Sequence, residues 1–288
     1  SKSKFPIVIK ADGLAAGKGV TIAHSAEEAH KALDDAMQKK IFGSAGTKVV
    51  IEDFLQGEEA SFIVLCDGKK TIPFASSQDH KARDNNDLGP NTGGMGAYSP
   101  APIVTEEIHK QVMEKIIKPT IDGLKSEGIT YKGFLYAGLM IKNSEISVLE
   151  FNCRFGDPET QPILMRMESD LAEICLLAAQ GNLNEREISW TKDSALGVVI
   201  ASKGYPFEYE KNKEINNLEN ENPRQKVFHA GTKTQEGQVL SNGGRVLCVT
   251  ALGSTLLDSK NLAYQKVKNI DWKDGFYRDD IGDKAIKS

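Results

Sequence analysis

Lysines and glycines gather near the start of the chain in a pattern typical of phosphate-binding loops. Residues 7–20 read IVIKADGLAAGKGV and hold two lysines, Lys10 and Lys18. Glycines let backbone amides approach phosphate oxygens, and lysines supply positive charge. The segment fails as a Walker A loop, which needs GxxxxGK and then Ser or Thr, and as a dinucleotide fingerprint, because a strand rather than a helix follows. The sequence predicts a glycine-rich hairpin against a phosphate, with a plain tight turn as the alternative.

A buried strand that runs into acidic residues comes next. Residues 49–55 read VVIEDFL, and after a turn at residues 56–57 the acids Glu58 and Glu59 open a second apolar run. Such a hinge suits an adenine ring bound to backbone groups, with one carboxylate near the ribose hydroxyls. Solvated acids at a sheet edge explain the pattern equally well, so both interpretations stay open.

Two oxygen-bearing side chains, Glu150 and Asn152, stand at the end of the apolar run 146–152. Alternate residues of a strand point to the same face, so the two side chains should converge. A carboxylate with a neutral oxygen donor suits Mg²⁺, which leaves its remaining positions to water and phosphate. The alternative is two polar residues at a strand end without a ligand.

Two polar stretches have no evident role in a core. Residues 78–81 read QDHK, with Asp84 close behind, and residues 91–98 read NTGGMGAY. The three glycines in residues 91–98 predict a backbone that lies against a ligand. A lone histidine such as His80 is more often satisfied within a loop than functional.

The elements that must hold these residues alternate between strands and helices. Apolar runs bounded by turn residues predict strands at residues 5–10, 19–23, 48–54, 59–66, 71–75, 133–142, 146–152, 195–201, 226–232 and 238–251. Capping patterns predict helices from Ser25 to about Lys39 and from Asp170 to Gly181, and apolar spacing predicts a third over residues 105–127. Polar residues 208–225 predict an exposed loop.

The composition excludes several classes of protein. The chain has 288 residues, 40% of them hydrophobic, and a formal net charge of −4, which builds no field that would attract nucleic acid or an anionic membrane. No apolar run approaches the roughly 18 residues of a membrane span, and Ser1 to Lys4 lack the apolar stretch of a signal peptide. Four cysteines without paired spacing argue against a zinc or redox motif. We expect a soluble, cytoplasmic protein.

Four longer motifs resemble the phosphoribosylamine–glycine ligases, also called glycinamide ribonucleotide synthetases, an ATP-grasp family of purine biosynthesis. They are KADGLAAGKGV at residues 10–20, QDHK at 78–81, GPNTGGMGAY at 89–98 and LEFNCRFGDPE at 149–159. FHAGT at 228–232 and GGRVL at 243–247 extend the resemblance, which runs from about Pro6 to Lys284. It implies that glycine, 5-phosphoribosylamine and ATP give glycinamide ribonucleotide, ADP and phosphate, through a glycyl phosphate that the sugar amine attacks.

The resemblance also assigns roles by position. Lys10 and Arg154 are the implied catalytic residues. ATP contacts are implied for Lys10, for the flap residues Asp12, Gly13, Gly17, Lys18 and Gly19, for the adenine hinge Glu52, Phe54 and Leu55, and for the ribose carboxylate Glu59. Glu150 and Asn152 are the implied ligands of Mg²⁺ or Mn²⁺. Contacts with glycine, the ribosylamine or its phosphate are implied for Asp79, His80, Lys81, Asn91, Thr92, Gly93, Gly94, Met95, Arg154, Gly156, Asp157, Pro158 and Glu159.

The implied fold is α+β. An ATP-grasp core has an incomplete lid at residues 1–54 and a main subdomain at residues 55–188, and a β-rich carboxyl-terminal domain covers residues 189–288. The family's amino-terminal Rossmann-like domain, and an early part of the lid with another phosphate-binding lysine, have no counterpart in this sequence, which opens without an initiator methionine. Residues 135–140 offer no third acidic metal ligand. We therefore expect these 288 residues alone to form product poorly.

Two other functions stay open. The first is another ATP-grasp ligase that joins a different carboxylate and amine. The second is an inactive nucleotide-binding fragment, which the retention of Lys10, Glu150 and Asn152 disfavours. The sequence predicts no oligomeric state.

Overall fold

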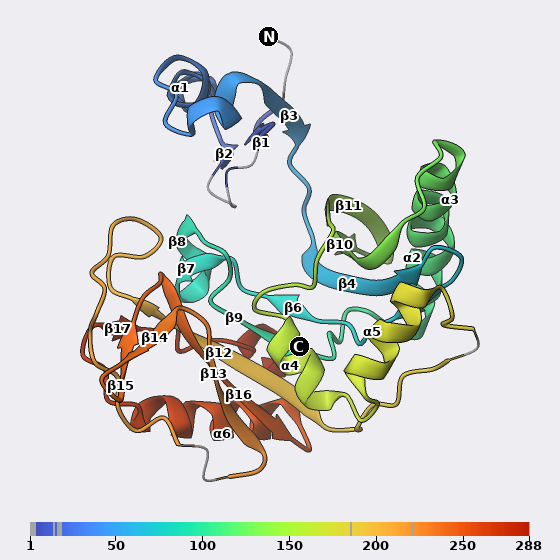
Figure 1. Ribbon diagram of the computed structural model, residues 1–288. Helices are drawn as coiled ribbons and strands as arrows, with labels where there is room; N and C mark the ends of the chain where they lie inside the picture. Colours follow the sequence, from blue (N-terminus) through green and yellow to red (C-terminus); the bar gives the residue numbers. More distant parts are fainter. Residues whose placement is uncertain (1–3, 14, 16–18, 185, 220–221, 288) are drawn as a thin grey trace. The chain divides into compact units, whose positions relative to one another are not determined.

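The computed structural model describes residues 4–13, 15, 19–184, 186–219 and 222–287 (Figure 1). The chain divides into two compact units. The smaller consists of Ser1–Gln56 with Asn91–Gly93, and the larger of Gly57–Pro90 with Gly94–Ser288.

The smaller unit is an antiparallel sheet with a helix on one face. The strand order is β2-β1-β3, for β1 (Ile7–Ala11), β2 (Val20–Ala23) and β3 (Val49–Asp53). Helix α1 (Ala26–Leu33) continues into the π-helical turn η1 (Asp34–Gln38), and a 3₁₀ turn, η2 (Gly43–Thr47), follows. The Ser25 hydroxyl accepts the Glu28 N–H at 3.2 Å, so the predicted helix start is confirmed.

The larger unit contains two antiparallel sheets and two short hairpins. The four-stranded sheet has the order β11-β10-β4-β5, for β4 (Glu58–Asp67), β5 (Thr71–Pro73), β10 (Lys132–Lys142) and β11 (Glu145–Asn152). The other sheet has the order β13-β16-β12-β9-β6 with β17 beside β12, for β6 (Gln78–Asp79), β9 (Gly96–Ser99), β12 (Ser194–Ser202), β13 (Gln225–His229), β16 (Arg245–Gly253) and β17 (Gly275–Phe276). The hairpins pair β7 (Ala82–Asp84) with β8 (Leu88–Asn91), around the turn η3 (Asn85–Asp87), and β14 (Thr232–Gln235) with β15 (Gln238–Ser241).

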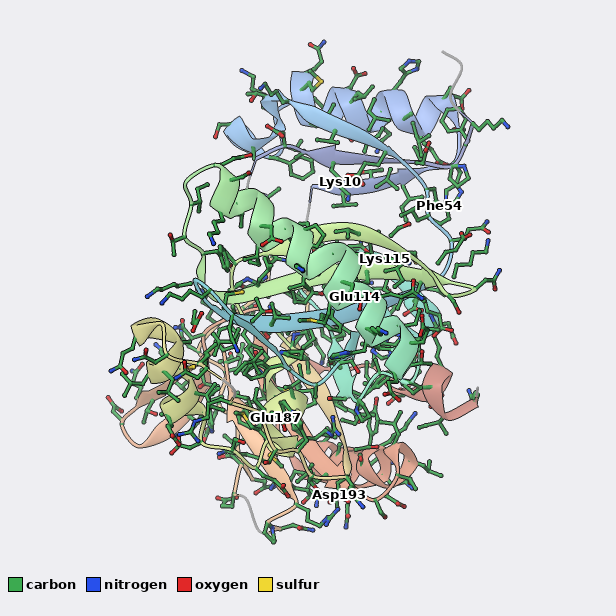
Figure 2. All side chains as sticks on the ribbon, turned by 90° about the vertical axis from the view of Figure 1, so that its right-hand side faces the viewer. Lys10, Phe54, Glu114, Lys115, Glu187 and Asp193 are labelled. Carbon is green, nitrogen blue, oxygen red and sulfur yellow. The ribbon has the colours of Figure 1, made fainter. Side chains whose placement is uncertain are left out.

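A long helix covers one face of the four-stranded sheet. It runs without a break through α2 (Glu106–Val112), the π-helical turn η4 (Met113–Ile117) and α3 (Lys118–Ser126), as the apolar spacing predicts. Ile108, Val112 and Ile117 are buried against alternate residues of β4 and β10. Figure 2 shows this helix lying across the strands, with Glu114 and Lys115 labelled on it. One face of the sheet is thereby closed, and polar chemistry is confined to the other.

The remaining helices flank the sheets of the larger unit. They are α4 (Thr160–Arg166), α5 (Leu171–Gln180), α6 (Leu256–Asn269) and α7 (Asp283–Lys287). The Asp170 carboxylate caps α5, and Gly181, in the left-handed conformation, ends it, as the sequence predicts. Of the helices in the described part of the chain, none combines the length and apolarity that crossing a membrane requires.

Some predicted boundaries are wrong. The strand expected at residues 238–251 is two strands, β15 and β16, and the one expected at 226–232 ends at His229. Glycines break both runs where two backbones approach closely: a Cβ at Gly231 would lie 2.7 Å from the Cα of Gly243. The predicted exposed loop is anchored at Ile215, which is 2% exposed and donates its N–H to the Val239 carbonyl.

The six-stranded sheet draws its strands from both sides of residue 188. Strands β6 and β9 come from the stretch assigned to the main subdomain, whereas β12, β13 and β16 come from the stretch assigned to the carboxyl-terminal domain. The predicted domain boundary at residue 188 stays a prediction.

Candidate active site

The ATP-contacting residues predicted near the start of the chain lie in the smaller unit. Lys10 on β1 and Glu52 on β3 form an ion pair with an N–O distance of 2.5 Å. Register and alternation place both side chains on one face of the sheet, while Ile7 and Ile9 pack with α1 on the other. Lys10 is labelled in Figure 2. The apolar side of β1 thus fixes the direction in which its lysine points.

Backbone bonds hold the described ends of the predicted flap. The Asp12 amide donates to the Lys48 carbonyl and the Gly13 amide to the Ala45 carbonyl, both at 3.0 Å. The Ala11 amide donates to the Gly19 carbonyl at 2.8 Å. Gly17 and Lys18 lie outside the described residues. Phe54 and Leu55, which directly follow β3, are half-buried.

In the larger unit, three neighbouring strands present polar side chains on the sheet face opposite the long helix. Ser61 of β4 pairs with Gly138 of β10, which pairs with Glu150 of β11. Tyr136 pairs with Asn152 in the same way. Gly138 places no side chain between its two partners, because a Cβ there would lie 3.2 Å from Cγ of Glu150. These side chains form the sheet-face cluster, which Glu59 completes at the start of β4.

Glu150 and Asn152 converge at the end of β11. The Asn152 amide nitrogen lies 3.4 Å from a Glu150 carboxylate oxygen, so the geometry that the spacing predicts is present. A carboxylate and an amide oxygen fit a magnesium ion whose remaining ligands are water and phosphate. Within the described ranges, no three His, Cys, Asp or Glu side chains gather around a point that could hold a metal. A metal here would therefore depend on two protein ligands.

A short bridge between the two sheets brings Asp79 and Lys81 to the cluster. The Ser61 amide donates to the Ser77 carbonyl at 2.7 Å, and the Ser77 amide donates to the Ser61 carbonyl at 3.2 Å. The Gln78 side chain donates to the Glu59 carbonyl at 2.9 Å. As a result the Lys81 ammonium lies 2.9 Å from a Glu59 carboxylate oxygen.

Carboxylates outnumber cations in the cluster. Burial raises the pKa of Asp79 to about 7, Lys81 opposes the rise, and Glu159 and Glu59 add to it. Burial alone would lower the pKa of Lys81, but Asp79 and Glu59 more than offset this and hold that pKa above its usual value. Glu150 also acts on Lys81. Lys81 thus faces three carboxylates, and Glu159 acts on one of them, Asp79, so the negative charge of the cluster favours a cationic ligand.

The loop between β11 and α4 is clamped by an arginine that the sequence analysis did not select. Arg245 of β16 donates to the Asp157 carbonyl at 2.8 Å and to its two carboxylate oxygens at 3.2 and 3.0 Å. Gly94 packs on the same loop, because a Cβ there would lie 2.4 Å from Pro158. The GGRVL motif contained the signal for Arg245. The exposed Arg154 guanidinium donates to the Phe155 carbonyl at 3.0 Å.

The structure does not bring His80 and Met95 to the cluster. Strand alternation turns His80 away from the side on which Asp79 and Lys81 lie, and its Nε2 accepts the Gly282 N–H at 3.3 Å. Met95 is completely buried in the core of the six-stranded sheet, with its backbone bonded to His80 and Val199. Among the described residues, the buried Nδ1 of His80 has no hydrogen-bond partner, so the imidazole is satisfied at Nε2 alone. Asn91, Thr92 and Gly93 belong to the smaller unit.

The segment that carries Asp79 and Lys81 is tied to the last residues of the larger unit. The Arg278 guanidinium, 2% exposed, donates to the Ala82 carbonyl at 3.0 Å, to Asp87 at 2.9 Å and to both Asp280 oxygens at 2.8 Å. Asp280 in turn accepts the Asn86 N–H at 2.7 Å. We call these contacts the Arg278 tie.

His80 makes stability depend on pH. Burial, followed by the charge of Arg278, lowers the pKa of His80 from 6.5 to about 4, against the opposing charges of Asp87 and Asp280. The unfolded chain therefore binds the extra proton between pH 4 and 6.5, so this contribution is complete above pH 6.5 and is lost as the pH falls towards 4. As the pH is lowered from 6.5 to 4, the free energy of unfolding should fall in both the parent and His80→Gln. We expect the fall in the parent to be larger by up to roughly 3 kcal/mol, because only the parent contains this imidazole.

Urea unfolding at a series of pH values measures the effect. Trp190 and Trp272, the two tryptophans of the chain, both lie in the larger unit, so their fluorescence follows the unit that contains His80. The control is His229→Gln, which removes an exposed imidazole from the same unit. Parallel pH profiles for the parent and His80→Gln would contradict the assignment.

Comparison with known protein families shows which family the chain belongs to. The profile described as phosphoribosylglycinamide synthetase, ATP-grasp (A) domain, matches residues 1–160, and the profile of the C domain of the same enzyme matches residues 195–284. The chain belongs to the phosphoribosylglycinamide synthetase family. The predicted family and its ATP-grasp fold with a β-rich carboxyl-terminal part are confirmed.

Individual relatives support the same family. Phosphoribosylamine–glycine ligases of Pasteurella multocida and Vibrio cholerae are 54% and 56% identical over 282 and 283 residues. Each match covers 98% of this chain but 66% of the relative, so the chain spans slightly less than two thirds of their length.

Solved structures show the same fold. The crystal structure of phosphoribosylamine–glycine ligase from Thermotoga maritima has a TM-score of 0.84 and 34% identity, covering 96% of this chain and 68% of that one. The biotin carboxylase domain of Hydrogenobacter thermophilus 2-oxoglutarate carboxylase has a TM-score of 0.71 at 14% identity, covering 95% of this chain and 58% of that one. The second likeness concerns the fold alone.

Proposed function

We propose that this chain supplies the catalytic machinery for joining glycine to 5-phosphoribosylamine with ATP, giving glycinamide ribonucleotide, ADP and phosphate. The family supports the reaction. The observation that carries the proposal is the gathering of Glu59, Lys81, Glu150 and Asn152 on one sheet face of the larger unit. In the smaller unit, the pair between Lys10 of β1 and Glu52 of β3 supports it.

The chemistry divides into two displacements. A glycine carboxylate oxygen attacks the γ-phosphorus of ATP and ADP leaves; the amine nitrogen of the sugar then attacks the acyl carbon, loses a proton, and phosphate leaves. Such transfers need alignment and charge neutralisation more than a protein nucleophile. A Mg²⁺ or Mn²⁺ ion, held by Glu150 and Asn152, would supply positive charge to the phosphates. Lys10 and the flap around Gly13 and Gly19 would hold the triphosphate.

The remaining assignments follow from charge. The surplus of carboxylates around Lys81 suits the ammonium group of glycine, and Arg154 and Arg245 suit anionic parts of the substrates. Glu52, Phe54 and Leu55 would receive the adenine. Cys66, Cys153, Cys175 and Cys248 form no disulfide, which fits a reducing compartment, and we place the reaction in the cytoplasm.

The test is phosphate release that requires ATP, glycine and 5-phosphoribosylamine together. It compares this chain with the chain joined to the amino-terminal region that the resemblance implies. We expect the shorter protein to be slower by about 10²–10³, because the resemblance assigns a phosphate-binding lysine to that region. Release with other carboxylates or amines, but not with glycine, would favour a different ligase. No release by either protein would favour an inactive nucleotide-binding fragment.

A further inference from the structure

A buried chain of hydroxyl groups leads to Glu159. The Ser61 hydroxyl lies 2.8 Å from Oε1 of Glu159 and 3.0 Å from the Tyr136 hydroxyl. Ser61, Tyr136 and Glu159 are 1%, 5% and 3% exposed. Three polar side chains this far from water, brought from two strands and a helix start, need their mutual bonds to offset the loss of hydration.

Each hydrogen bond between these three side chains has a definite donor and acceptor. A carboxylate oxygen only accepts, so the single Ser61 proton goes to Glu159, and Tyr136 must donate its own proton to Ser61. A phenol keeps its proton at neutral pH, because its ordinary pKa is about 10. The Ser61 hydroxyl therefore donates to Glu159, and Tyr136 orients that hydroxyl by donating to it.

The missing side chain of Gly156 leaves space beside the other oxygen of the same carboxylate. A Cβ at Gly156 would lie 2.7 Å from Cδ and from Oε2 of Glu159. Such a contact would be relieved by rotating the Glu159 side chain away, which would break its bond to Ser61. Two independent features thus fix the position of the Glu159 carboxylate: the absence of a side chain at Gly156, and the hydrogen bonds from the hydroxyl groups.

We infer that Ser61, Tyr136 and Gly156 are positioning residues that hold the Glu159 carboxylate ready for the ammonium group of the amino-acid substrate. Ser61 bonds Oε1, so Oε2 is the oxygen that the ammonium would meet. Asp79 and Glu159 act on each other electrostatically, which places a second carboxylate nearby. This inference rests on the proposed ligase function and names the part of the site that recognises glycine.

The experiment measures the KM for glycine and for ATP in the more active of the two proteins compared above. We expect Ser61→Ala to raise the KM for glycine about tenfold or more, because it loses a bond to a charged group, while the KM for ATP stays within about twofold. Tyr136→Phe should raise the KM for glycine less. The variant that combines Ser61→Ala and Tyr136→Phe should have the same KM for glycine as Ser61→Ala alone, because Tyr136 acts through Ser61. Gly156→Ala should also raise the KM for glycine.

The control is Tyr131→Phe, which removes a hydroxyl that donates to the Phe134 carbonyl at 2.7 Å. Tryptophan fluorescence during thermal unfolding reports whether each variant folds. Equal effects on glycine and ATP, or the same shift in Tyr131→Phe, would overturn the positioning role. If Ser61→Ala fails to fold, Tyr136→Phe decides alone. Absence of glycine-dependent turnover in the unmodified protein would instead overturn the proposed function and this inference together.

Discussion

Replacing Glu150 with alanine is expected to lower ATP- and glycine-dependent turnover by more than about 100-fold while leaving the fold intact. Changes to groups that only support a metal ligand typically cost about 10–100-fold, and loss of a directly bound carboxylate should exceed this. Glu150 is exposed at the end of β11, so its truncation opens no cavity in the core. Asn152 would remain as a neutral ligand without a charged partner.

The matched control is Glu145→Ala, which makes the same change at an exposed position at the other end of β11. Turnover measured across a magnesium titration should be unchanged in this control. In Glu150→Ala, higher magnesium should restore only part of the lost turnover. Activity within about threefold of the parent would remove Glu150 from the metal site.

Arg278→Met is expected to lower the free energy of unfolding by on the order of 3 kcal/mol, because it leaves Asp87 and Asp280 close together without their shared cation. The side chain is 2% exposed, and its bonds to the two acids and to the Ala82 carbonyl have no substitute in methionine. Urea unfolding followed by tryptophan fluorescence measures the change.

The comparison variant is Arg186→Met, which breaks an ion pair to Glu173 whose two side chains are 56% and 53% exposed. That loss should cost less than about 1 kcal/mol, since exposed pairs are screened by water. Similar losses in the two variants would show that burial gives the Arg278 tie no special strength.

Local patterns predicted most elements and one part of the site geometry. Glu150 and Asn152 share a face because strand alternation operates within a single strand, and the Ser25 and Asp170 caps act within one helical turn. The family resemblance, carried by long motifs, predicted the fold. These signals lie in contiguous stretches of sequence, so no knowledge of distant partners was needed.

The rest depends on pairing between distant segments. Strand β6 is two residues long and exists because it pairs with β9, and no periodicity in QDHK reveals it. Tyr136 and Ser61 meet Glu159 through the register of β4 and β10, and Arg245 reaches Asp157 from 88 residues away. His80 was carried into the predicted site with its motif, whereas alternation along the strand turns it to the opposite side.

The Arg278 tie has a consequence for the order in which the site can form during synthesis. Arg278 and the Ala82 carbonyl that it binds are 196 residues apart in the chain. At about 5–20 residues per second, a ribosome adds Arg278 roughly 10–40 seconds after Ala82. Throughout that interval a nascent chain already contains Asp79 and Lys81 but lacks the guanidinium that secures their segment. We therefore expect the segment that carries Asp79 and Lys81 to reach its final position only after Arg278 has been added to the chain.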